Sequence, residues 1–476
     1  MAPEIPGYFY DSGKRRYFKV ENSKTAPATA AWSADNVKKR RLEDEEAAAA
    51  IQRMTLQKHR IRRSKVLSEP LMGGFFDRER NQAGSDNVPA ASFAKGMLEK
   101  GQLPLADARW RSSSNLKHMY IGAMDHKTIL CTAHATLDEL TLLSSYLPRD
   151  RNGRVHRRLL AEYATPGNRM GPYREIDIPQ ISDIKYVEHS HYMLITSRRP
   201  GRNISLWGFR PRVSEPDDRQ PHWILGSSDV AYTHWSTRGD GDHKDYQANC
   251  VVPAPMSSGM ICALGTSRGL VQMNDAGDLK WMTTGTPGPS FRDIFALDFQ
   301  RGHRDVLLFG GRPGRLFTGD TRVHCEKWNS IKLPGPITHI RALNEHQALV
   351  SGVNHQLSTY DLRFARKRRD APNASAPIQV FPQYRNSAHI DIGLDYDKST
   401  GVVATAHDDG KVALYSVRSG KRLRCTDVDN IRSNRGPIQS IQFQTFPGDH
   451  LPTLFVGVHS NINAYSFGVE NLEDEA

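Results

Sequence analysis

The sequence contains few cysteines and no long hydrophobic run. Its 476 residues include five cysteines that stand singly, with no C-x-x-C pair: Cys131, Cys250, Cys262, Cys325 and Cys425. A disulfide framework or a zinc ribbon needs grouped cysteines, so neither is expected. No stretch of eighteen apolar residues occurs, and the N-terminus MAPEIPGYFYDSGKRRYF lacks the apolar core of a signal peptide. We therefore expect a protein of a reducing compartment without a membrane span.

The sequence also lacks the motifs of common enzymes. It has no H-E-x-x-H zinc motif and no G-x-x-x-x-G-K-[ST] phosphate loop. One G-x-S-x-G occurs, GTSRG at 265–269, but it is expected to join two strands, whereas a nucleophile elbow joins a strand to a helix. Ser267 is therefore interpreted as a turn residue. His189 and His191 share one side of a predicted strand, but without an identifiable third ligand they predict no metal site.

Two further motifs are interpreted as hairpin turns. HDDGK at 407–411 places carboxylates beside a histidine, and GGRPG at 310–314 resembles a glycine-rich phosphate loop. Both fall between alternating apolar runs, where such residues supply turn geometry. GGRPG opens no predicted helix, so it offers no helix N-terminus to a phosphate group. We expect no catalysis and no cofactor.

Positive charge is in excess. The formal net charge is +12, and residues 1–110 hold 20 Lys and Arg against 14 Asp and Glu. Within this arm, residues 33–67 contain no Pro or Gly, with Ser33 as a candidate N-cap and acidic residues ahead of basic ones, which suits a helix dipole. A basic amphipathic helix is predicted, with Ile51 on a narrow apolar stripe. The stripe is expected to dock on its own domain or to insert into a partner's groove.

Two basic clusters lie in this segment, VKKRRL at 37–42 and KHRIRR at 58–63. Clusters of this kind are typical of import signals, so we expect both nuclear and cytoplasmic residence. A basic arm also attracts nucleic acid, but a charge excess this modest is more often a solvated face. Nucleic acid is therefore not expected as the main partner.

Beyond residue 114 the sequence repeats short alternating runs separated by turns. The closing strand of a unit recurs as NISLWGFR, RLFTGDTR, QLSTYDLR, KVALYSVR and NINAYSFG, each after an apolar strand and a hairpin. Recurrence at roughly 40 to 55 residues with this content predicts an all-β propeller of four-stranded blades. Seven units are predicted, at 115–146, 182–212, 248–286, 292–323, 335–364, 387–421 and 436–468.

The seventh unit shows only three strands, so a stretch just before the first unit is expected to supply its fourth. The segments 148–179 and 213–249 are expected to be long connecting loops. The predicted parts of the chain are an aromatic N-terminal box with a linker, a basic helix, a second linker, the propeller and an acidic tail, at 1–32, 33–67, 68–114, 115–468 and 469–476.

The N-terminal segment IPGYFYDSGKRRYFKV has aromatic residues on both sides of the polar turn DSGKRR. This pattern predicts a small aromatic hairpin. Two short strands alone are marginal in water, so we expect the hairpin to pack as a lid on the propeller. Stacking of its rings on a single-stranded nucleic acid is the alternative.

An aspartate after an aromatic residue at the end of the closing strand, as in TYDLR, is typical of WD repeats. The segments IPGYFYDSGKRRYFKV, LFTGDTR, LSTYDLR and LFVGVHSNINAYSF together resemble cullin-4-associated factor 4. This WD-repeat family supplies substrate receptors that dock on the damaged-DNA-binding adaptor of cullin-4 ubiquitin ligases. The resemblance covers the first twenty residues and most of the chain after residue 290. It implies a seven-bladed WD-repeat β-propeller with a helical, partly disordered N-terminal extension.

The resemblance also implies which residues contact the adaptor. It assigns docking to Arg363 and Arg322, with Asp361 and Asp320 holding each arginine in place. Tyr360 is expected to pack at the blade edge.

Three departures from this pattern are relevant. Gly319 replaces the aromatic residue expected before Asp320, and Arg210 and Arg418 follow closing strands that lack the aspartate, so they are expected to serve as internal controls. The resemblance further implies that Ile51 lies in a cavity of the adaptor. Two other functions stay open: a generic WD-repeat scaffold in a nuclear complex for RNA processing or chromatin, and a direct nucleic-acid binder.

Overall fold

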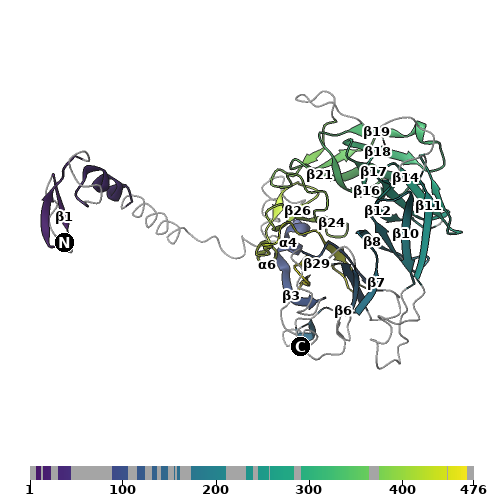
Figure 1. Ribbon diagram of the computed structural model, residues 1–476, viewed down its shortest axis with the longest axis horizontal. Coiled ribbons are helices and arrows are strands. Elements are labelled where there is room, and N and C mark those ends of the chain that lie inside the picture. The colour runs from purple at the N-terminus through teal and green to yellow at the C-terminus, as the bar shows by residue number, and fades with distance from the viewer. Residues whose placement is uncertain are drawn as a thin grey trace. The chain divides into compact units, whose positions relative to one another are not determined.

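A computed structural model describes most of the chain after residue 87 and short stretches before it (Figure 1). The described residues are 7–11, 14–22, 31–43, 88–105, 115–123, 131–136, 141–147, 155, 158–160, 173–210, 232–239, 245–256, 258–283, 291–363, 375–446 and 449–468. The chain divides into two units, Met1–Glu69 and Pro70–Ala476, which are described separately. No helix within the described residues is both long enough and apolar enough to span a membrane.

The first unit contains the predicted aromatic hairpin. Strand β1, Tyr8–Asp11, pairs antiparallel with β2, Arg16–Lys19. The ring of Phe18 stacks on Trp32 with 4.8 Å between the centroids, and the Lys14 ammonium lies 5.6 Å from the Phe18 centroid. The hairpin thus packs on the segment that leads into a helix, which supplies the apolar contact that two strands alone lack.

Residues 34–43 are helical, and Ser33 caps this helix as predicted. The Ser33 hydroxyl accepts a hydrogen bond from the Asn36 backbone N–H at 3.4 Å, the usual N-cap contact. Residues 38–41 of the basic cluster are exposed, and the Arg40 guanidinium lies 5.7 Å from the Phe9 ring centroid. The rest of the predicted helix, including Ile51, lies outside the described residues.

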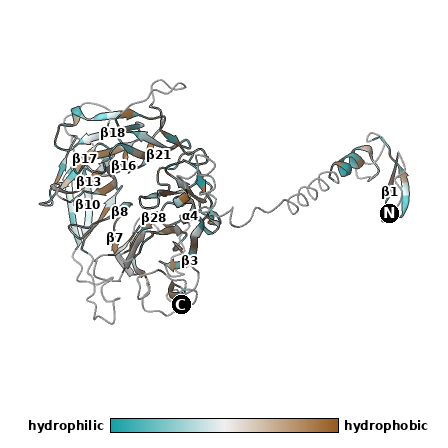
Figure 2. Ribbon diagram, turned by 180° about the vertical axis from the view of Figure 1, so that it is seen from behind, coloured by the Kyte–Doolittle hydropathy of each residue, from teal (hydrophilic) through white to brown (hydrophobic). Residues whose placement is uncertain are grey.

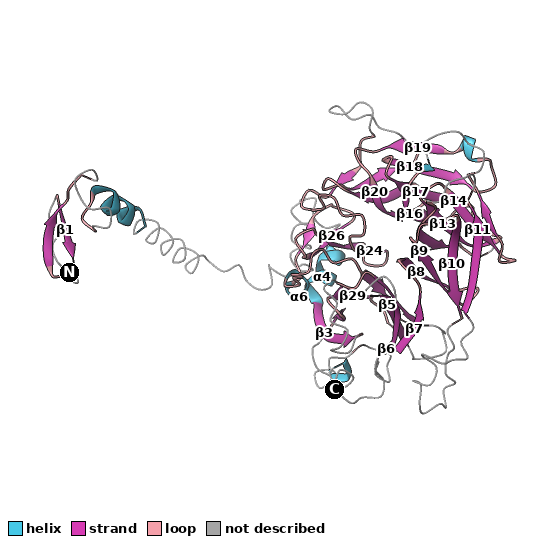
Figure 3. Ribbon diagram, in the orientation of Figure 1, coloured by secondary structure: helices cyan, strands magenta, loops and turns pink. Residues whose placement is uncertain are grey.

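The second unit contains seven four-stranded antiparallel sheets, which confirm the predicted propeller (Figure 3). We name the strands of each blade a to d in their order across the sheet, starting at the central channel. The first four blades, in this order, are β4 His118–Ala123, β5 Cys131–Thr136, β6 Thr141–Leu147 and β7 Tyr173–Asp177; β8 Ile181–Val187, β9 Tyr192–Ser197, β10 Asn203–Phe209 and β11 Tyr232–Arg238; β12 Ala248–Pro253, β13 Met260–Thr266, β14 Leu270–Asn274 and β15 Leu279–Trp281; and β16 Ile294–Phe299, β17 Val306–Gly311, β18 Arg315–Asp320 and β19 Asn329–Lys332.

The remaining three blades complete the ring. They are β20 Ile337–Ala342, β21 Gln347–Gly352, β22 Leu357–Asp361 and β23 Gln379–Val380; β24 Leu394–Asp397, β25 Val402–Ala406, β26 Val412–Ser416 and β27 Arg422–Leu423; and β28 Ile441–Gln444, β29 Thr453–Val458, β30 Asn461–Phe467 and β3 Met97–Pro104. Short helices lie at α4 Val88–Gly96, η4 Cys325–Lys327 and α6 Thr426–Asp429.

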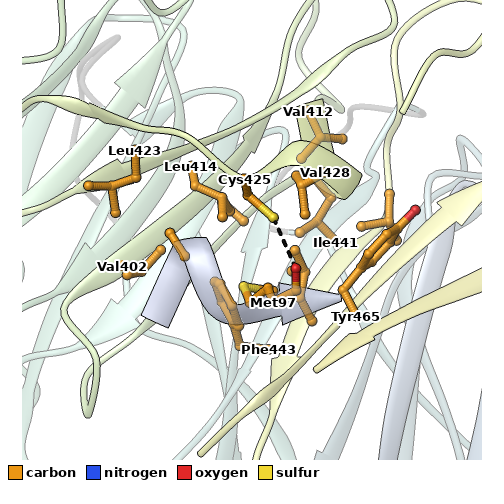
Figure 4. Close-up of a cluster of buried hydrophobic side chains, with 14 of the residues drawn as sticks. Met97, Val402, Val412, Leu414, Leu423, Cys425, Val428, Ile441, Phe443 and Tyr465 are labelled. Carbon is orange, nitrogen blue, oxygen red and sulfur yellow. Dashed lines mark hydrogen bonds between the residues drawn. The ribbon is translucent and has the colours of Figure 1, made fainter. Parts of the chain in front are cut away.

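Blade 7 closes the ring as predicted, because β3 pairs with β30 and supplies the fourth strand. Helix α4 and β3 then pack on blades 6 and 7, where Met97, Phe443 and Tyr465 are buried in one apolar cluster (Figure 4). The Cys425 thiol in this cluster donates a hydrogen bond to the Met97 carbonyl at 3.5 Å. The propeller therefore begins at Val88, inside the segment 68–114 that was expected to be a linker.

The core lies between neighbouring sheets. Every residue of the b strands β13 and β25 is buried, which fits their continuous apolar runs MICALGT and VVATA. Figure 2 shows hydrophobic segments on the strands of the blades. The outer strands differ, because β11 alternates between half-buried and exposed residues and β27 has two residues.

These weak outer strands account for a second difference from the expected organisation. Strands β7 and β11 lie inside the segments 148–179 and 213–249, which were expected to be loops. An outer strand packs on one sheet neighbour only, so its sequence needs no apolar run. Blades 1 and 2 consequently extend to Asp177 and Arg238.

Polar side chains on the a strands connect neighbouring blades. The Asp395 carboxylate in blade 6 accepts a hydrogen bond from the Phe443 backbone N–H in blade 7 at 2.7 Å. The same contact recurs between other blades, from Val251 N–H to Asp183 at 3.1 Å, from Ala342 N–H to Asp298 at 2.7 Å, and from Ile121 N–H to Gln442 at 2.8 Å. Each of these backbone N–H groups thus donates to a side-chain oxygen of a neighbouring blade, which satisfies a half-buried donor.

Candidate functional site

The two predicted Asp-x-Arg boxes lie at equivalent places in neighbouring blades. Strand β22 of blade 5 ends at Asp361, and strand β18 of blade 4 ends at Asp320. In each box the aspartate accepts a hydrogen bond from the backbone N–H two residues later, at 3.0 Å in both Arg363 and Arg322. This turn is the local conformation that aspartate favours, so the short sequence D-x-R explains why the strand stops there.

The same carboxylates hold the arginine side chains. Asp361 accepts from Arg363 Nε at 3.1 Å and from its terminal nitrogen at 3.0 Å. Asp320 accepts from Arg322 at 2.9 and 2.7 Å. The Asp361 side chain is 11% exposed whereas Arg363 is 52% exposed. Each two-point pair therefore presents one face of a guanidinium at the blade rim in a defined orientation.

The ion pairs shift the acidity of both aspartates. Hydrogen bonds from Arg322 lower the pKa of Asp320 to about 2, and hydrogen bonds from Arg363 lower the pKa of Asp361. The arginine pKa values rise for the same reason. Both pairs are consequently charged at neutral pH, and a change between pH 5 and 8 does not release either guanidinium.

The aromatic position of the two boxes is filled in different ways. Tyr360 is buried at 2% exposure, and its hydroxyl accepts a hydrogen bond from Gln356 at 3.2 Å. At Gly319 a Cβ atom would lie 2.7 Å from the Trp328 ring, and the Trp328 indole N–H donates to the Asp320 carbonyl at 2.9 Å. Trp328 thus occupies the space that an aromatic residue at position 319 would need. Sequence reasoning missed this residue because it belongs to the following loop.

Only one of the two arginines expected to serve as controls occupies the same position as Arg363. Ser416 faces Val402 at the start of strand b, as Asp361 faces Gln347, so Arg418 is the positional equivalent of Arg363 without its aspartate. In blade 2, Phe209 faces Met193, so Arg210 takes the place of the aspartate itself. The Arg210 guanidinium lies 4.7 Å from the Tyr192 ring centroid. Arg418 is a matched control, and the expectation for Arg210 is wrong because the b–c turn of blade 2 is longer.

The remaining candidate residues have structural partners. Ser267 lies in the turn between β13 and β14, as predicted, and accepts a hydrogen bond from the Gln247 N–H at 3.1 Å. His191 lies 2.9 Å from the Tyr186 hydroxyl. Burial lowers the pKa of His407 in the HDDGK turn to about 4, so this imidazole is neutral, and it lies 3.2 Å from the Tyr415 hydroxyl. Among the described residues no cluster of metal-ligating side chains occurs.

Comparisons with known proteins concern the fold alone. A scan against protein-family models and a search of curated proteins find no match. Among solved structures the chain is similar to the crystal structure of the WD40 β-propeller domain of Doa1, with a TM-score of 0.50 and 9% sequence identity over 78% of this chain and 97% of that chain. Together with the seven sheets, this similarity shows that the chain folds as a seven-bladed WD40-like β-propeller.

Proposed function

We propose that this chain is a substrate receptor that docks on the damaged-DNA-binding adaptor of cullin-4 ubiquitin ligases and presents a target protein for ubiquitination. The WD40-like propeller by itself indicates a protein-interaction scaffold, a fold that usually has no catalytic role. The pair of Asp-x-Arg turns on blades 4 and 5 supports the finer proposal. The resemblance noted in the sequence gives these two turns their docking role.

The geometry of the two turns suits an interface contact. Each arginine loses little side-chain freedom on binding, because its aspartate already fixes the guanidinium. A partner carboxylate or backbone carbonyl then meets a preorganised donor. Thr321 and Leu362 separate aspartate from arginine in the two boxes, so the turns share their backbone geometry but differ in the side chain between.

The size of the free-energy change on mutation distinguishes a docking role of the arginines from a purely structural one. An exposed ion pair contributes about 0 to 1 kcal/mol to folding. Removal of one partner from a desolvated interface contact costs about 2 to 5 kcal/mol of binding free energy. We therefore expect Arg363→Ala combined with Arg322→Ala to weaken adaptor binding by more than about tenfold, the factor that 1.4 kcal/mol represents, with little change in melting temperature.

The experiment is a titration of purified adaptor into the wild-type chain, the double variant and Arg418→Ala, with melting temperatures measured in parallel. Arg418→Ala removes an exposed arginine from the equivalent place of a blade that lacks the aspartate, so it should bind like the wild type. Equal affinity of the wild type and the double variant would overturn the proposal. The generic nuclear scaffold would then be the better description of this protein.

A further inference from the structure

The b–c turns and the d–a loops lie at one end of the propeller, which we call the upper face. They are hydrogen-bonded to one another around the ring. The Arg312 N–H donates to the Asp293 carbonyl at 3.2 Å, and the Asp408 N–H donates to the Arg385 carbonyl at 3.1 Å. Strand c begins at the upper face and ends at the Asp-x-Arg turn, so the two rims are separated by the length of a strand.

Among the described residues, the upper face exposes more arginines than acidic side chains. Five exposed arginines there form no ion pair with any described residue: Arg199, Arg202, Arg292, Arg385 and Arg432. Three of the described aspartates at this end have basic partners, whereas Asp408 accepts hydrogen bonds from Ser387. Arg268 pairs with Asp245 at 2.9 Å, Arg312 with Asp293 at 2.7 Å, and Lys411 with Asp409 at 2.6 Å. The surplus is therefore positive and available to an anionic partner.

The central channel forms a cavity of about 370 Å³ that is lined by residues along the a strands, from Thr338 to Arg341 in blade 5 for example. Arg198 and Asp391 also line it, and we call this upper end of the channel its mouth. Arg198 of blade 2 and Asp391, which precedes strand a of blade 6, form a two-point ion pair with both distances at 2.6 Å. Blades 2 and 6 are not neighbours in the ring, so this pair crosses the mouth of the channel. Its side chains are 28% and 34% exposed, and solvent reaches them.

Other charged groups at the mouth have partners or are neutral. Lys185 pairs with Asp183 at 3.2 Å. Burial lowers the pKa of His118 to about 4 and that of His339 to about 3, so both imidazoles are uncharged at neutral pH. Arg198 differs from these groups, because its partner Asp391 belongs to a non-neighbouring blade and lies in a loop.

We propose that the upper face binds an acidic peptide segment of a partner protein, with one of its carboxylate or phosphate groups replacing Asp391 on Arg198. The Arg198 guanidinium can donate two parallel hydrogen bonds to the two oxygens of either group, as it does to the Asp391 carboxylate. Flanking acidic residues of the peptide meet the surplus arginines. This inference is independent of adaptor docking, because it concerns the opposite rim.

A peptide fits this surface better than a nucleic acid. A phosphate backbone needs a continuous basic track along the surface, whereas an acidic peptide needs only spaced basic groups and one anion site at the mouth. The paired aspartates Asp245, Asp293 and Asp409 interrupt such a track. A peptide can place its carboxylates beside the arginines and its neutral residues beside these three aspartates.

The first test measures binding of a fluorescein-labelled decapeptide of alternating Glu and Gly to the full chain by anisotropy. The same peptide with a central phosphoserine compares the two anion types, and an alternating Gln and Gly peptide is the neutral control. Arg199→Glu with Arg202→Glu should weaken binding of the acidic peptide by about tenfold, because like charges then face each other. Arg304→Glu with Lys398→Glu reverses two exposed charges in a–b turns at the opposite end, and should not weaken it.

The second test uses Asp391→Asn, which removes the carboxylate that Arg198 binds but keeps the side-chain shape. Acidic-peptide affinity should rise about threefold or more with this variant, and fall with Arg198→Gln, provided that both variants melt as the wild type does. Equal affinities for the acidic and neutral peptides, an equal loss with Arg304→Glu and Lys398→Glu, or unchanged affinity of Asp391→Asn would overturn the proposal. Binding of a 20-nucleotide single-stranded DNA with no binding of either acidic peptide would indicate a nucleic-acid surface instead.

Discussion

At the Asp-x-Arg turns a half-buried carboxylate supports a more exposed guanidinium. The aspartate serves the fold by ending strand c, and the arginine serves the surface. Sequence alone predicts this arrangement well, because both contacts span two residues and depend on local turn chemistry. It does not predict Trp328, because a later loop folds back to place this ring against Gly319. It also does not predict the strand pairing of blade 2, which places Arg210 where the other boxes have aspartate.

The low pKa of Asp320 gives the first box a defined acid dependence. Its folded pKa of about 2 lies below the ordinary 3.8, so its contribution to stability is complete above that ordinary value and is lost as the pH falls toward 2. We expect the difference in unfolding free energy between the wild type and Asp320→Asn to be constant from pH 5 to 8 and to shrink below pH 4. Urea unfolding at pH 7, 4 and 3 checks this. A difference that grows on acidification would contradict it.

At the scale of elements, the acceptors that join neighbouring a strands fix the spacing between blades. Asp395→Ala removes the partner of the Phe443 N–H and also leaves Arg341 without a carboxylate 3.5 Å away. We expect a loss of about 1 to 3 kcal/mol in unfolding free energy, the cost of a half-buried donor without an acceptor. Asp275→Ala, at an exposed turn between strands c and d, should cost less than about 0.5 kcal/mol. Equal urea midpoints for the two variants would refute the role of these contacts.

Two truncations distinguish the contribution of the first unit from that of α4 and β3. Removal of residues 1–69 deletes the first unit and should leave the melting temperature of the propeller unchanged. Removal of residues 1–104 also deletes α4 and β3, exposes the cluster around Phe443, and should lower the melting temperature strongly. If the predicted helix at 33–67 contacts the adaptor, the shorter truncation and Ile51→Asp should both weaken adaptor binding. A lower melting temperature after the shorter truncation would instead indicate packing on the propeller.

Strands b and c were predictable from sequence, because each is a continuous or alternating apolar run next to a hairpin turn. The sequence predicted that some stretch before blade 1 would supply the fourth strand of blade 7. It did not predict which residues form this strand, β3. Its own sequence MLEKGQLP contains two charged residues and a glycine with φ +131° at a β-bulge, so no strand pattern marks it. Outer strands such as β11 are set by the neighbour they pair with rather than by their own sequence.

At the scale of the whole molecule, the Asp-x-Arg turns and the upper face lie at opposite ends of strand c. Strand β22 has five residues and rises about 3.3 Å per residue, so the two rims are about 16 Å apart and offer separate surfaces. We expect the adaptor and the acidic peptide to bind at the same time. Anisotropy of the labelled peptide should give the same affinity with and without saturating adaptor. Competition between the two would place both partners on one rim.

Ring closure by β3 also determines when the protein can finish folding. The Asn461 side chain in β30 bonds to Gln102 in β3 across 359 residues of sequence. At about 5 to 20 residues per second of synthesis, β3 waits roughly 20 to 70 seconds on the ribosome before its partner strand exists. During that interval the apolar residues of α4 and an unpaired strand edge are open to other chains, and a β3 from a second molecule fits the same gap. Nascent chains of this protein should therefore depend on chaperones until the last blade is made, and crowded synthesis should favour strand-exchanged dimers.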